Sequence, residues 1–66
     1  MTVSLEELRG HLLKEWEHQI AEMGNLESQA EAEMETKGNV EAETRIRYAR
    51  VLGRADSLEH ALSYLK

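Results

Sequence analysis

The chain has 66 residues, a mass of 7.6 kDa and a formal net charge of −5. Such an acidic balance argues against a dedicated nucleic-acid or anionic-membrane binder, because both need a basic surface. The sequence has no cysteine, which excludes disulfides and thiolate-bound metal. Proline and phenylalanine are also absent, and 32% of the residues are charged. This composition favours an all-α protein.

The short length has a consequence for stability. A domain of this size buries a modest share of its surface and usually needs a disulfide, a metal or a partner chain. With disulfides and thiolate-bound metal excluded, we expect a homo-oligomer, most simply a dimer, or a chain completed by a larger protein partner. The sequence has no apolar run long enough for a membrane span and no signal-peptide pattern, so we expect no membrane association and a cytoplasmic location.

The first predicted element is one long helix over residues 5–36. Ser4 is a favourable N-cap, and Glu7 follows at the spacing of a capping box. Apolar residues then recur at steps of three and four, and their phase continues across Gly24 and Asn25. Two separate helices would have no reason to share a phase, so we favour one helix over a break at Gly24 that would give a three-helix bundle. The expected core stripe comprises Leu5, Leu8, Leu12, Trp16, Ile20, Met23, Leu26, Ala30 and Met34.

A turn is predicted at residues 37–39, followed by a second helix over residues 40–65. Lys37, Gly38 and Asn39 supply in order a cation for the helix end, a residue suited to left-handed backbone, and an N-cap. So short a turn makes the helices antiparallel neighbours. We therefore expect an antiparallel two-helix hairpin that pairs into a four-helix bundle. The second stripe comprises Val40, Thr44, Tyr48, Val51, Ala55, Leu58, Leu62 and Leu65.

The two predicted helices carry complementary charges, because the first is acidic and the second is rich in arginine. These charges support the antiparallel pairing. A turn centred on Gly38 predicts which residues face each other. The expected pairs are Glu31 with Arg47, Glu27 with Arg50, Glu22 with Arg54, and Glu33 with Arg45. The alternative is that Arg45, Arg47, Arg50 and Arg54 form a nucleic-acid-binding face on a dimeric four-helix bundle, as in plasmid RNA-binding proteins built from paired hairpins. The net charge favours the first interpretation.

Catalytic and metal sites have little support in the sequence. His11, Glu15, His18 and Glu22 share a face of the first helix, and a Glu-x-x-His spacing occurs in di-iron bundles. That face points away from the apolar stripe, however, and the second stripe carries no carboxylate. No phosphate loop or positioned catalytic set is present. We expect a protein that is not an enzyme and binds no cofactor or metal, and the role of His11, Glu15 and His18 stays open.

Two groups of residues are candidates for a protein interface. Leu5 and Leu8 extend beyond the expected end of the second helix and would be exposed. Opposite the second stripe, Ala49 and Gly53 form a small-x-x-x-small step flanked by Ile46 and Tyr64. A glycine inside a helix costs about 1 kcal/mol relative to alanine, so a packing role is plausible. We interpret this second group as a dimer or partner face.

Residues 48–59, which contain the step Gly53-Arg54 followed by Leu58-Glu59, resemble the second helix of small hairpin proteins encoded by bacteriophages. This resemblance implies an accessory or assembly protein with a protein partner, located in the virion if the chain is phage-encoded. The length and the glycine-containing turn are also similar to hairpin co-chaperones of type III secretion needle subunits. From the residues and these resemblances we expect a non-enzymatic protein–protein interaction or assembly function.

Overall fold

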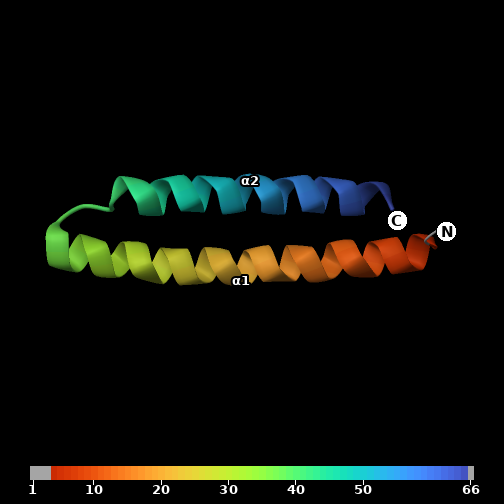
Figure 1. Cartoon of the computed structure of the whole chain (residues 1–66), viewed down its shortest axis with the longest axis horizontal. Coiled ribbons are helices and arrows are strands. Elements are labelled where there is room, and N and C mark those ends of the chain that lie inside the picture. Colours follow the sequence, from red (N-terminus) through yellow and green to blue (C-terminus); the bar gives the residue numbers. More distant parts are fainter. Residues whose placement is uncertain (1–3, 66) are drawn as a thin grey trace.

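The computed structural model, which describes residues 4–65, is an antiparallel pair of helices (Figure 1). Helix α1 spans Leu5–Lys37 and helix α2 spans Ala42–Tyr64, and this part of the chain contains no strand. The pair measures 50 × 21 × 14 Å. The all-α hairpin is confirmed. Helix α1 also runs without interruption through Gly24, as expected from the continuous apolar phase.

The helix ends follow the sequence signals in part. The Ser4 hydroxyl accepts a hydrogen bond from the Glu7 backbone N–H at 3.1 Å, as an N-cap does. Gly38 ends α1 in the left-handed conformation, with φ 78°, and donates its N–H to the Met34 carbonyl. Helix α2 begins later than predicted, however. Its N-cap is Glu41 instead of Asn39, and the Glu41 side chain makes no capping bond.

A carboxylate from α1 supports the start of α2. The Glu33 side chain is only 8% exposed, and it accepts hydrogen bonds from the Glu41 backbone N–H at 3.0 Å and the Thr44 hydroxyl at 2.8 Å. The Gln29 amide donates a third bond at 3.1 Å. The Glu41 N–H, the Thr44 hydroxyl and the Gln29 amide all favour the ionised form, so the pKa of Glu33 lies below its ordinary value. Glu33 therefore ties the two helices together across the turn.

This network predicts a dependence of stability on pH. A carboxyl group with a lowered folded pKa contributes stability that is complete above the unfolded pKa near 4.5 and is lost as the pH falls through the folded pKa. The midpoint of urea unfolding should therefore fall on acidification below about pH 5. Glu33→Gln should remove part of that fall, whereas Glu35→Gln, on the exposed side of α1, should retain the parent's behaviour. Equal pH profiles for the two variants would contradict the role of Glu33.

The inner face of α2 matches its predicted stripe, but the inner face of α1 departs from its prediction. Ile20 and Met34 are 41% and 55% exposed, whereas Gln19 and Glu33 are buried in their place. The inward positions of α1 alternate steps of four and three, which is the period at which two helices stay in contact. The predicted stripe moved one residue off this period at Ile20 and again at Met34. The inward positions are 12, 16, 19, 23, 26, 30 and 33.

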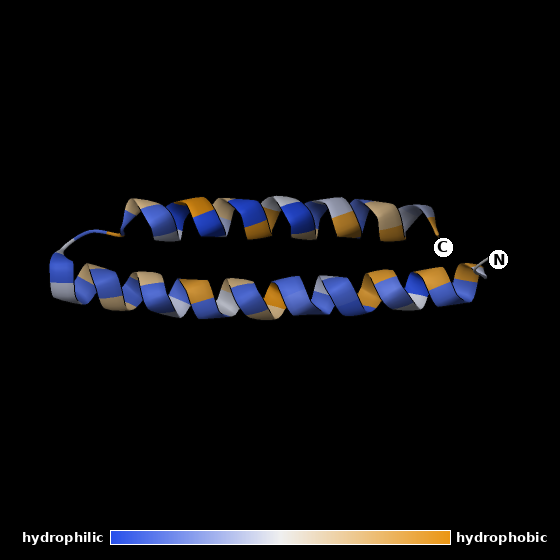
Figure 2. Ribbon diagram, viewed as in Figure 1, coloured by the Kyte–Doolittle hydropathy of each residue, from blue (hydrophilic) through white to orange (hydrophobic). Residues whose placement is uncertain are grey.

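The resulting core is thin. Within residues 4–65, Leu26 and Ala55 are the only buried apolar residues. The chain exposes 5351 Å², whereas a compact protein of this mass exposes about 4,300 Å². Figure 2 shows apolar segments along the facing edges of the helices and others on surfaces turned away from the partner helix. The single hairpin therefore leaves about 1,000 Å² more surface in water than its mass requires.

Candidate interaction surfaces

The two leucines at the start of α1 are exposed as predicted. Leu5 is 69% exposed and Leu8 is 41% exposed. The Arg9 guanidinium donates a hydrogen bond to the Leu65 carbonyl, so α2 ends at about the height of Arg9. Leu5, one turn before Arg9, thus lies beyond the end of the second helix, whereas Leu8 lies at about the height where that helix ends. Their place at the open end of the hairpin suits contact with another chain.

The predicted interface on α2, called here its outer face, comprises Ile46, Ala49, Gly53 and Tyr64. This face is exposed, but its large apolar side chains are widely spaced. Ile46 is 54% exposed and Tyr64 is 77% exposed, and they lie about 27 Å apart along the helix axis. The Tyr64 ring packs edge-on against His60, with ring centroids 5.0 Å apart. A Cβ atom added at Gly53 would meet nothing within 4 Å. Packing inside the hairpin therefore does not require this glycine.

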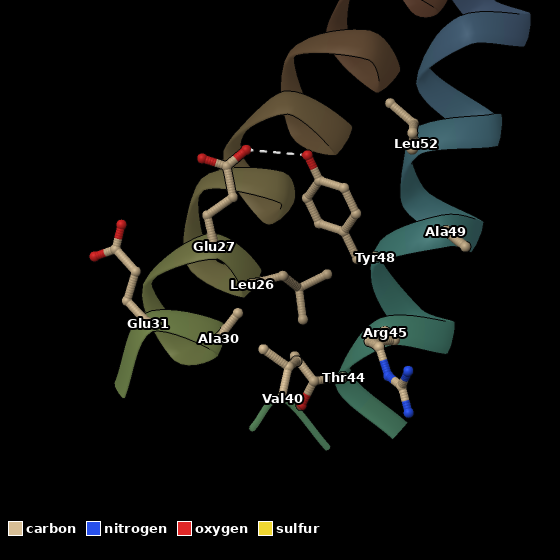
Figure 3. A pocket seen from close by; sticks show the side chains of 10 residues that line it. All are labelled: Leu26, Glu27, Ala30, Glu31, Val40, Thr44, Arg45, Tyr48, Ala49 and Leu52. Atoms are coloured by element: carbon tan, nitrogen blue, oxygen red, sulfur yellow. Dashed lines mark hydrogen bonds between the residues drawn. The ribbon is translucent and has the colours of Figure 1, made fainter. Parts of the chain in front are cut away.

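A groove between the helices was not predicted from the sequence. It has a volume of about 540 Å³ and opens on one flank of the hairpin (Figure 3). Leu26, Ala30 and Val40 lie at its floor, and Leu52 lies on its α2 wall. Ala30, Val40 and Leu52 therefore leave apolar surface open to solvent in this groove, whereas Leu26 is buried.

Charged side chains stand on the two walls of this groove. Glu27 and Glu31 belong to the α1 wall and Arg45 to the α2 wall (Figure 3). The Tyr48 hydroxyl reaches across and donates to the Glu27 carboxylate at 3.1 Å. That hydrogen bond, with smaller contributions from desolvation and the Glu27 charge, raises the pKa of Tyr48 above its usual value. The groove thus has an acidic wall, a basic wall and an apolar floor.

The ion pairs predicted between the helices do not form. Across residues 4–65, Arg54 makes the only ion pair between α1 and α2, at 3.6 Å from Glu15 rather than with Glu22. Glu27 and Glu33 instead accept hydrogen bonds from hydroxyl groups of α2, and Glu33 accepts another from the backbone N–H of the residue that caps α2. The helical spacing places Arg54 on the flank opposite the groove, and Arg45 on the groove side. The four arginines therefore do not form one cluster.

The histidines of α1 do not assemble a ligand set. Glu15 accepts a hydrogen bond from the Gln19 amide at 3.2 Å and pairs with Arg54. No group of three potential ligands occurs within residues 4–65. Within those same residues, neither helix is long and apolar enough to cross a bilayer.

We compared the chain with known proteins. No protein-family model, curated protein or solved structure matches it. The functional assignment therefore rests on the surfaces of the hairpin itself, namely the leucines at its open end, the outer face of α2 and the groove between the helices.

Proposed function

We propose that this chain is a non-enzymatic assembly protein that pairs with a second copy into a four-helix bundle and, in that form, binds a larger protein partner. The observation that carries this proposal is the surface left uncovered by the thin core. The excess exposure of about 1,000 Å² compares with about 800 Å² that each partner loses in a standard interface. A second copy would thus bring the exposed area close to that of a compact protein.

The outer face of α2 is the candidate site for the larger partner. Ile46 and Tyr64 are exposed there, and Ala49 and Gly53 leave the helix backbone accessible between them. The resemblance to phage-encoded hairpin proteins supports a partner of the virion-assembly type. The exposed Leu5 and Leu8 offer a second contact with such a partner at the open end of the hairpin.

The substitution Gly53→Leu tests whether the outer face of α2 binds a larger partner or a second copy of the chain. Because a side chain at this position meets open space, leucine should raise stability by up to about 1 kcal/mol through its better helix propensity. The mass should stay that of the parent dimer. Sedimentation equilibrium at several concentrations, with urea unfolding alongside, measures both. A dimer weakened by this substitution would place the outer face in the self-association interface. A parent that is monomeric at every concentration would refute self-association altogether.

A second candidate function is nucleic-acid binding, and one observation favours it. Arg47, Arg50 and Arg54 lie within about 60° of one another around α2. Arg47 and Arg50 form no ion pair within the described part of the chain. A mobility-shift assay with single- and double-stranded RNA and DNA at moderate salt tests this alternative. Binding that weakens steeply with salt and is lost on Arg47→Ala with Arg50→Ala would favour it over a protein partner.

A further inference from the structure

We propose that the groove flank of the hairpin is the surface on which the second copy docks, with α1 of each copy lying against α2 of the other. This inference rests on the proposed self-association and adds the face, the symmetry and the contacts. The two-fold axis runs parallel to the helices. It brings Ile20 against Leu52 of the second copy, and Glu27 against Arg45 of the second copy.

An apolar line on α1 continues the groove. Leu13, Ile20 and Met34 are 43%, 41% and 55% exposed, and they share the seven-residue spacing of Glu27, which lines the groove. Residues seven apart lie on nearly the same side of a helix. Apart from Leu5 and Leu8 at the open end, the large exposed apolar side chains of α1 thus gather on the groove flank. On the opposite flank of α1, the corresponding positions between Leu8 and Thr36 are Glu15, Glu22 and Gln29.

Helix α2 contributes the matching side. Leu52 is 39% exposed and lines the groove one turn from Tyr48. Because Tyr48 reaches Glu27 and Arg54 reaches Glu15, Leu52 lies at the height of the α1 segment that contains Ile20. Each hairpin therefore carries one exposed apolar residue on each helix at the same height, which is the arrangement that a two-fold contact requires.

Charge decides between the two ways of pairing these flanks. An axis parallel to the helices places α1 on α2 of the second copy and keeps every residue at its height, so the acidic wall with Glu27 and Glu31 meets the basic wall with Arg45. An axis perpendicular to the helices would place α1 on α1. Helix α1 carries nine acidic and three basic side chains, and Glu27 and Glu31 are the ones that line the groove. Like charges would then face each other, which disfavours that arrangement.

Disulfide crosslinking tests the arrangement directly, because the chain has no cysteine of its own. Ile20→Cys and Leu52→Cys are prepared as separate chains, co-refolded in equal amounts and oxidised. Mass spectrometry and non-reducing gels then quantify each disulfide. The mixed disulfide between the two variants should form at least about tenfold faster than either variant's own disulfide, because only the mixed pair is held in contact. Ile46→Cys, on the outer face of α2, serves as the control and should crosslink only at the slow rate of random collision.

The possible outcomes distinguish an error in the docking surface from an error in the proposed self-association. Rapid self-disulfides of Ile20→Cys and of Leu52→Cys would overturn the parallel axis, and rapid self-disulfides of Ile46→Cys would move the contact to the outer face. Ile20→Glu should raise the dimer dissociation constant at least about tenfold, whereas Ile46→Glu should change it less than about twofold. If both glutamate substitutions weaken a dimeric parent equally, the groove flank is not the docking surface, although the chain still self-associates. A parent that sediments as a monomer would refute the proposed function itself.

Discussion

Leu26→Ala should lower the free energy of unfolding by about 2–5 kcal/mol, the range for large-to-small changes at buried sites. Leu26 is 3% exposed and is the one large apolar residue buried within residues 4–65. Small domains have little stability to lose, so this single change should leave a substantial fraction of the chain unfolded at room temperature. Urea unfolding followed by circular dichroism measures the effect.

The matched control for this substitution is Ile46→Ala, on the outer face of α2 and away from both the core and the groove flank. Ile46 is 54% exposed, so its truncation should change the free energy of unfolding by less than about 1 kcal/mol. The two variants remove the same number of carbon atoms from a helix. An Ile46→Ala variant that is destabilised as much as Leu26→Ala would mean that residue 46 is covered in the folded protein and that the outer face of α2 is assigned wrongly.

Trp16→Ala should cost about 3 kcal/mol, the lower end of the range for a core aromatic, because the side chain is only half-buried. Its indole N–H is buried without a hydrogen-bond partner in the described structure. An unmet buried donor costs about 1–3 kcal/mol. Trp16→Phe removes this donor while keeping an aromatic ring, so it should change stability by less than about 1 kcal/mol.

Thermal unfolding of the parent, Trp16→Ala and Trp16→Phe at one chain concentration measures these differences. Circular dichroism is the probe, since the chain has no other tryptophan to report by fluorescence. If Trp16→Phe loses as much stability as Trp16→Ala, the indole N–H makes a stabilising bond in the folded protein. If neither variant is destabilised, Trp16 does not pack between the helices.

The fold was largely predictable because the strongest signals in the sequence are local. A left-handed glycine at Gly38, an N-cap at Ser4 and an unbroken phase across Gly24 set the two helices and their antiparallel order. The inner face of α2 was also predictable, since its apolar residues already follow the period of a helix pair. These signals need no knowledge of what the chain packs against.

The details of α1 were harder to predict because buried polar residues replace apolar ones there. Glu33 is buried because it bonds the start of α2, and Gln19 because the helix pair keeps its period. A hydropathy pattern favours Met34 and Ile20 instead. The groove was missed for the same reason: with Ile20 assigned to the core, the exposed line on α1 was no longer visible. The seven-residue spacing of Leu13, Ile20, Glu27 and Met34 in the sequence indicates this exposed line.

Self-association is the central claim, and the dependence of unfolding on chain concentration tests it most directly. If a second copy binds only the folded hairpin, dilution must lower the melting temperature, because association and folding are linked. We therefore expect the melting temperature, followed by circular dichroism, to rise steadily as the chain concentration is raised a hundredfold. A melting temperature that stays constant over that range, together with a monomeric mass, would contradict self-association.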